Sequence, residues 1–255
     1  MKNVLEFIGF SAGYGKTEVL KNLDLALLPG EVTALIGENG CGKTTLLRCA
    51  AGLMKGKGVY LREGKPADIR SMRENAAFAV YLSQQENVTL SMNVVDYMLL
   101  GIGGRKQQRE EAARKALIRF GCEDFAEKDY TALSGGQKQL VRLSALTLRK
   151  GKMLLLDEPD SALDIVNRGL VLSYFRSRAK EMGEAVLMSC HDVNAALSCA
   201  DRLVFLKDGI VSADLRMCDC KEKELQSAFD TVFPGTEAAK VNGTYILMGE
   251  NHYEA

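Results

Sequence analysis

Short apolar runs separated by amphipathic stretches make up most of the chain. Several runs are about the length of a strand and almost wholly apolar, which is typical of strands buried on both faces. Helical patterns follow some of these runs, and strands that alternate with helices predict an α/β fold. The strands expected in this part of the fold are residues 32–36, 78–82, 153–156, 185–189 and a pair within 201–215.

Two regions depart from this alternation. Residues 5–10 and 19–28 have the pattern of strands on either side of a glycine-rich loop at 11–16, and a short strand is expected at 59–61. After residue 85 the apolar residues recur at helical spacing instead, which predicts a helical insertion. The helices expected there and beyond are residues 91–100, 107–120, 122–128, 134–148, 165–182 and 221–229.

Composition bounds the class of protein. The 255 residues are 47% hydrophobic, enough for a sizeable core, and 33 basic residues balance 33 acidic ones. Net charge therefore favours neither nucleic acid nor an anionic membrane surface as a partner. The N-terminus lacks the apolar middle of a signal peptide, and no run approaches the ~20 apolar residues of a membrane helix. We expect a cytoplasmic protein with reduced thiols, since its seven cysteines lack paired zinc spacing.

Residues 37–44, Gly-Glu-Asn-Gly-Cys-Gly-Lys-Thr, form a complete GxxxxGK[ST] phosphate-binding loop. A strand is expected before it and a helix after it, which is the order that the motif requires. Glycines let consecutive backbone N–H groups turn toward a phosphate, and the helix dipole adds its positive end. Lys43 would reach the terminal phosphates, and the Thr44 hydroxyl is placed to bind Mg²⁺. The sequence therefore predicts a nucleotide site.

A second anion site is expected at Leu133-Ser134-Gly135-Gly136-Gln137. Ser134 is a good N-cap residue, and two glycines in the first turn leave the orphan N–H groups uncovered by side chains. A flexible cap without a ligand explains this pentapeptide equally well when it is considered alone.

Two acids follow the apolar run 153–156, at the end of a strand where parallel sheets place their ligands. Asp157 suits the Mg²⁺ side of a phosphate-binding loop, and Glu158 suits polarising an attacking water. A surface acid pair is the alternative. His191 follows another strand end and is either a site residue or structural, and Tyr14, in a glycine-rich turn, either stacks on a purine or packs locally.

Taken together, these motifs resemble those of the ATPase subunits of ATP-binding cassette (ABC) transporters, over residues from about 3 to 215. The resemblance implies an α/β P-loop NTPase fold with a mixed β-sheet core, an antiparallel β subdomain and an inserted α-helical subdomain. One nucleotide-binding domain would span 1–255, with its core at 1–85 and 150–215, the helical subdomain at about 86–149 and a C-terminal extension at 216–255.

The resemblance also implies the site residues. The implied catalytic residues are Glu158, His191, Gln84 and Lys43. The implied metal ligands are Thr44, Gln84 and, through water, Asp157. Asp164 would couple the two sites of a dimer. ATP and Mg²⁺ are the implied cofactors. The nucleotide-binding residues would be Tyr14, Gly37, Glu38, Asn39, Gly40, Cys41, Gly42, Lys43, Thr44 and Thr45 and, in trans, Ser134, Gly135, Gly136 and Gln137.

Two subunits of the family dimerise head to tail, and closure on ATP drives a membrane permease. The run His191-Asp192-Val193-Asn194 and the single-domain length look most like the ATPases of importers for iron-siderophores, haem or vitamin B12. The implied partners are a second copy, transmembrane permease subunits and an extracytoplasmic substrate-binding protein, without nucleic acid. The chain would then lie on the inner face of the cell membrane. A soluble assembly ATPase, like the cassette of iron–sulfur cluster biogenesis, is the alternative.

Some positions depart from the usual family pattern, Leu140 and Cys190 among them. Asp160 replaces the usual small residue after Glu-Pro, and Cys41 stands inside the phosphate-binding loop, where a small residue is usual. The helix N-terminus and Lys43 should both favour the Cys41 thiolate, so a reactive thiol is one hypothesis. An inert small filler is the other.

Overall fold

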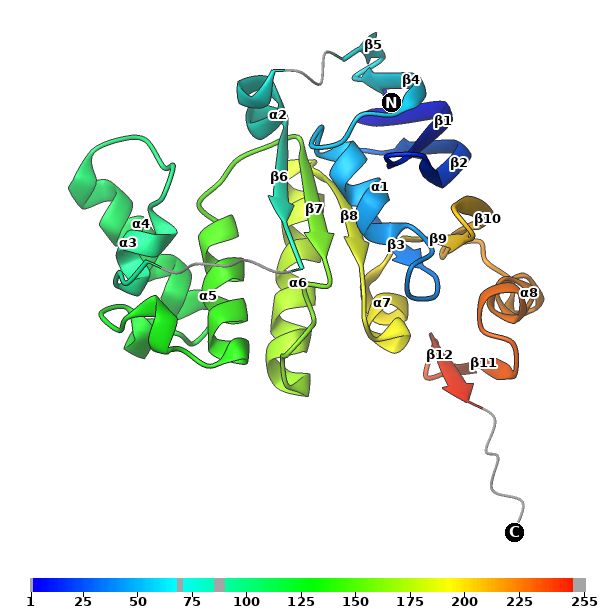
Figure 1. The fold of residues 1–255 in the computed structure, drawn as a ribbon. Helices are drawn as coiled ribbons and strands as arrows, with labels where there is room; N and C mark the ends of the chain where they lie inside the picture. Colours follow the sequence, from blue (N-terminus) through cyan, green and yellow to red (C-terminus); the bar gives the residue numbers. More distant parts are fainter. Residues whose placement is uncertain (1, 68–70, 85–89, 250–255) are drawn as a thin grey trace.

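The computed structural model describes residues 2–67, 71–84 and 90–249, and this part of the chain forms three sheets with helices around them (Figure 1). The central sheet has six strands in the order β10-β9-β3-β8-β7-β6. Its strands pair in parallel except β10, which is antiparallel to β9, so the sheet is mixed. The strands are β3 (Val32–Ile36), β6 (Ala79–Leu82), β7 (Met153–Asp157), β8 (Ala185–Ser189), β9 (Arg202–Lys207) and β10 (Ile210–Arg216).

The central strands are buried on both faces. Every residue of β3, β7 and β8 is buried, which explains why their sequences are continuous apolar runs rather than alternating ones. Within β3, Val32, Ala34 and Ile36 belong to one core cluster, whereas Leu35 belongs to the other. The first cluster includes side chains of α5 (Gly135–Leu146), α6 (Ile165–Met182) and α7 (Val193–Cys199), and the second those of α1 (Lys43–Ala50).

A second, antiparallel sheet covers the α1 side, in the order β2-β1-β4-β5. Its strands are β1 (Leu5–Tyr14), β2 (Thr17–Leu27), β4 (Lys57–Arg62) and β5 (Lys65–Pro66). The loop predicted at 11–16 is wrong in extent, because β1 and β2 stay paired as far as Tyr14 and Thr17. Register shifts along β1 accommodate this long pairing.

The predicted helical insertion lies beyond the β6 edge of the central sheet, where Figure 1 shows α3, α4 and α5 grouped together. It contains α3 (Val94–Met98) and α4 (Lys106–Arg119) before α5. The first helix is shorter than predicted because the Asn93 side chain caps it, accepting a hydrogen bond from the Asp96 amide at 2.8 Å. The helix predicted at 122–128 is wrong, since only a single 3₁₀ turn, Glu123–Phe125, forms there.

Two short helices were not predicted. The helix α2 (Met72–Phe78) is capped by Ser71, and α7 is capped by Asp192. Most of α2 is exposed, so it lacks the apolar stripe that marks a helix in a sequence. No helix in the described ranges is long and apolar enough to cross a membrane.

The C-terminal segment forms α8 (Glu222–Val232) and a two-stranded sheet of β11 (Thr236–Val241) and β12 (Thr244–Gly249). The hairpin predicted at Asn242-Gly243 is confirmed: Val241 pairs with Thr244, and both turn residues have positive φ. Figure 1 shows α8 and the hairpin beyond the β10 edge, opposite the helical insertion.

Candidate functional site

A cavity of about 390 Å³ lies at the carboxyl ends of β3, β7 and β8. Four separate segments line it, and they meet because parallel strands bring the loops at their carboxyl ends to one edge of the sheet. The lining residues are Asn39, Gly40, Gly42, Lys43, Thr44, Thr45, Gln84, Glu158 and His191.

The loop between β3 and α1 forms one wall. Gly40 and Gly42 have φ of 83° and 113°, a region that favours glycine, and Gly42 is the N-cap of α1 without any side-chain capping bond. The first amides of α1 are therefore not covered by a cap side chain, as an anion site requires. The Lys43 ammonium lies over the loop, where it donates to the carbonyl oxygens of Gly37 at 2.6 Å and Glu38 at 2.9 Å.

Cys41 lies beneath the loop rather than in the cavity. Its sulfur packs against Gly37, where an added Cβ would come within 2.5 Å of it. Burial raises the pKa of the Cys41 thiol, and this effect outweighs the opposite influence of Lys43. The expectation that the thiolate is favoured is therefore wrong, because the thiol is buried.

Asp157 is buried at the end of β7, where three hydroxyl groups surround its carboxylate. Thr44 and Ser189 donate to its Oδ1 at 3.1 and 2.9 Å, and Tyr81 donates to its Oδ2 at 3.3 Å. Burial and the nearby Asp157 raise the pKa of Tyr81, so that this hydroxyl remains a donor. The Thr44 hydroxyl and the Asp157 carboxylate are oxygen ligands of the kind that Mg²⁺ takes, so the residues present fit that ion.

Glu158 reaches the cavity through an unusual backbone turn. Its φ is 50°, in the left-handed region that few residues other than glycine adopt, and its amide donates to Ser189 Oγ at 3.0 Å. The Glu158 carboxylate accepts a hydrogen bond of 2.9 Å from Nε2 of Gln84. The two side chains therefore approach each other from loops that follow adjacent strands, β7 and β6.

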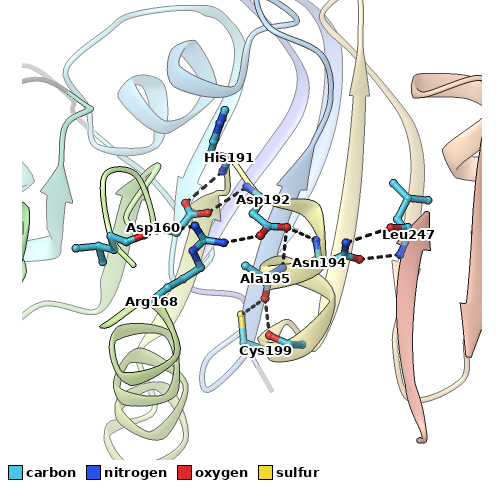
Figure 2. A network of polar contacts seen from close by, with 10 residues as sticks. Asp160, Arg168, His191, Asp192, Asn194, Ala195, Cys199 and Leu247 are labelled. Atoms are coloured by element: carbon cyan, nitrogen blue, oxygen red, sulfur yellow. Dashed lines mark hydrogen bonds and ion pairs between the residues drawn. The ribbon is translucent and has the colours of Figure 1, made fainter. Parts of the chain in front are cut away.

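His191 comes from the loop after β8, and a chain of polar contacts continues from it (Figure 2). Asp160 accepts hydrogen bonds from the His191 and Asp192 amides, and Asp192 caps α7 and pairs with Arg168. The Asn194 side chain bonds both backbone groups of Leu247 in β12, at 3.1 and 2.7 Å. The loop that carries His191 is thus held on one side by Asp160 and continues into a helix tied to the C-terminal hairpin.

Ser134, Gly135, Gly136 and Gln137 do not line the cavity of their own chain. They begin α5, where Ser134 and Gln137 form a reciprocal capping box. Gly136 packs against the segment after β7, since a Cβ there would come within 2.7 Å of the Ala162 carbonyl oxygen.

Two further predicted residues lie outside this cavity. Tyr14 is half-exposed and its hydroxyl accepts a bond of 3.2 Å from Arg48. Asp164 caps α6, and the hydrogen bond from the Asn167 amide lowers the pKa of its carboxyl.

Sequence reasoning did not single out Ser189 or Tyr81, and it did not assign Asp160 a contact. Ser189 did carry a signal, because it is a polar residue that ends an apolar strand and pairs in register with Asp157. Tyr81 and Asp160 reach their partners across the fold, which no local pattern shows. Gln85 of the loop after β6 lies outside the described residues.

The site combines three features at one edge of the sheet: a phosphate-binding loop, a buried aspartate hydrogen-bonded to the threonine of that loop, and a glutamate. Together they define a P-loop NTPase. A family model described as "ABC transporter" matches residues 20–161. The chain belongs to the ABC transporter family and is an ATP-binding ATPase cassette of that family.

Curated relatives of similar identity are import ATP-binding proteins. The hemin protein HmuV of Streptomyces coelicolor is 35% identical over 80% of this chain and 75% of its own length. The aliphatic sulfonates protein SsuB 2 of Pseudomonas aeruginosa is 36% identical over 81% and 73%. The spermidine/putrescine protein PotA of Mesoplasma florum is 35% identical over 82% of this chain, which spans only 60% of that relative's length.

Solved structures share the fold. The ATP-binding subunit of an ABC transporter superposes with a TM-score of 0.78 at 23% identity, covering 90% of this chain and 99% of that one. A cassette bound to ADP and Pi, in a post-hydrolysis state, gives a TM-score of 0.74 over 84% and 98%. The prediction of an α/β P-loop fold with a mixed sheet, an antiparallel sheet and inserted helices is confirmed.

Proposed function

We propose that this chain is the ATP-hydrolysing subunit of a membrane importer. The observation that supports it most directly is the meeting of Gln84, Glu158 and His191 with the phosphate-binding loop on one cavity. These side chains come from the loops after three different strands, so a core-packing requirement alone does not explain their convergence.

The proposed chemistry is electrostatic positioning of the terminal phosphate and of water. Lys43, the loop amides and His191, which also lines the cavity, neutralise the phosphate oxygens. Glu158 orients the attacking water, and Gln84, 2.9 Å away, holds the carboxylate in place. Thr44, Gln84 and, through water, Asp157 would hold Mg²⁺, which when bound neutralises charge on the phosphates.

A second copy would complete the site. Ser134, Gly135, Gly136 and Gln137 lie outside the cavity of their own chain, yet the Gly135 and Gly136 amides at the start of α5, which the capping box does not engage, suit a phosphate. We infer that they act in trans in a homodimer, and that Asp164 couples the two sites. Tyr14 would stack on the adenine.

A membrane permease would dock beside the loop after β6. A groove of about 230 Å³ runs between the end of β6 and the helices α3 and α5, with Leu82, Met98 and Arg142 among its lining residues. Such a groove, lined by apolar side chains together with Arg142 and Arg149, fits a short helix of a membrane protein. The chain would then lie on the cytoplasmic face of the membrane, together with an extracytoplasmic substrate-binding protein.

The proposed substrate class is an iron-siderophore, haem or cobalamin. Its support is the run from His191 to Asn194 and the hemin-import relative, while relatives for sulfonates and polyamines are equally similar. Co-purification tests the assignment. A polytopic permease with a substrate-binding protein that retains haem, ferric siderophore or cobalamin supports it. A soluble scaffold complex would instead favour the assembly ATPase.

Replacing Glu158 by Gln tests the hydrolytic role. The variant should bind ATP as the wild type does and lose hydrolysis by about 10²-fold or more, because the water is no longer polarised. It should also accumulate as an ATP-bound dimer in size-exclusion chromatography. Glu181→Gln, the same change at the exposed end of α6, is the matched control. A monomeric Glu158→Gln protein with normal turnover would refute the proposal.

A further inference from the structure

Asp160 is a buried acid between the loops that carry Glu158 and His191. It is 2% exposed, and its two carboxylate oxygens accept one backbone hydrogen bond each, from His191 at 3.2 Å and Asp192 at 3.1 Å (Figure 2). In the part of the chain that the structure describes, these are the hydrogen bonds that the carboxylate makes. A buried carboxylate is costly without such partners, so both bonds are strongly favoured.

The two bonds constrain the backbone at the position that carries the histidine. Arg168, the nearest cation in this network, pairs with Asp192 and not with Asp160 (Figure 2). The carboxylate is therefore held by the amides of the His191 loop itself. A small residue, which is usual after Glu-Pro, offers at most one side-chain oxygen and could not give each amide an oxygen of its own.

We propose that Asp160 is a positioning residue for His191 in ATP hydrolysis. It fixes the His191 loop relative to the segment that begins with Glu158, so that the two side chains reach the terminal phosphate together. This inference rests on the proposed function, since it requires His191 to act on that phosphate. It assigns Asp160 no contact with the nucleotide.

The consequence is a loss in turnover without a loss in ATP binding. Asp160→Asn leaves one acceptor and places an NH₂ group against an amide donor, and Asp160→Ser leaves one oxygen. Each should lower kcat about tenfold, less than the 10²–10³-fold typical of losing one donor to the developing charge. The Kd for ATP, measured with magnesium withheld to prevent turnover, should change less than about twofold, since most binding contacts remain.

A double-mutant cycle separates positioning from general damage. Combined with His191→Ala, the Asp160→Asn change should lower kcat by less than about twofold more, because the group that it positions is already gone. A further tenfold loss in the double variant would overturn the proposal. So would a wild-type kcat in both Asp160 variants.

Matched measurements keep the outcomes distinct. Asp201→Asn also alters a carboxylate that accepts a backbone amide, from Val32 at 2.9 Å, but it lies away from the cavity and should keep kcat. Thermal unfolding curves show which variants remain folded at the assay temperature. If Asp160→Asn is unfolded at that temperature, Asp160→Ser takes its place in the cycle. A normal kcat in the His191→Ala variant would refute the proposed role of the histidine. A low kcat in His191→Ala together with normal kcat values in the Asp160 variants would refute only the positioning role of Asp160.

Discussion

The buried ion pair of Arg178 and Glu184 gives a prediction that the geometry makes quantitative. Arg178 donates to the two Glu184 oxygens at 2.6 and 3.0 Å, and the side chains are only 3% and 5% exposed. The guanidinium also donates to the carbonyl oxygens of Leu146 and Arg149, at 3.3 and 2.7 Å. The pair therefore holds the end of α5, the helix that Ser134 caps, against α6.

Glu184→Gln should destabilise the protein far more than a surface substitution. The change leaves the Arg178 charge buried without its counter-charge, which costs about 3–5 kcal/mol in comparable buried pairs. For a chain of this size each kcal/mol lowers Tm by about 2–4 °C, so the midpoint should fall by about 10 °C. Chemical denaturation should give the matching loss in unfolding free energy.

A control and a second variant show whether the buried charge is the cause. Glu111 pairs with Lys115 on α4, and both side chains are more than half exposed, so Glu111→Gln should change stability by less than about 1 kcal/mol. Arg178→Met combined with Glu184→Leu removes both charges and should cost less than Glu184→Gln alone. A Glu184→Gln protein as stable as the Glu111→Gln control contradicts this account.

Two further predictions concern thiols and the C-terminal hairpin. Burial raises the pKa of the Cys41 thiol and raises that of Cys49 to about 12, so both thiols stay protonated at neutral pH. Iodoacetamide should therefore label the exposed Cys218 first, as followed by mass spectrometry. Labelling of Cys41 as fast as that of Cys218 contradicts this account. Asn194→Ala removes the two hydrogen bonds to Leu247, so hydrogen exchange of the Leu247 amide should become several-fold faster. An unchanged exchange rate would show that the Asn194 side chain does not hold β12.

The strands and the phosphate-binding loop could be predicted because their signals are local. Continuous apolar runs mark β3, β7 and β8, and the spacing of glycines and Lys43 marks the turn into α1. The convergence of Glu158 and His191 followed from a general property of parallel sheets, that strand ends share an edge. Sequence reasoning succeeded where one segment, or one rule of topology, was sufficient.

The failures share a physical cause, which is that the deciding contacts are distant in sequence. Cys41 has neighbours that favour a thiolate, but burial of its sulfur against Gly37 raises the pKa of the thiol instead of lowering it. The Tyr81 hydroxyl is directed by Asp157, 76 residues away. The segment at 122–128 has helical composition, but the Asn93–Asp129 bridge joins its end to the start of α3 and only a 3₁₀ turn remains.

The contact between Gly136 and Ala162 has a consequence for how sequences of this kind can change. Ala162 has a φ of 59°, and its carbonyl oxygen already occupies the space that any side chain at 136 would need. A larger residue at 136 is therefore accommodated only if the backbone around Ala162 shifts, whatever side chain stands at 162. The residue that follows Ser134 and Gly135 is thus restricted by the backbone of a separate segment, the one that leads to the cap of α6 at Asp164.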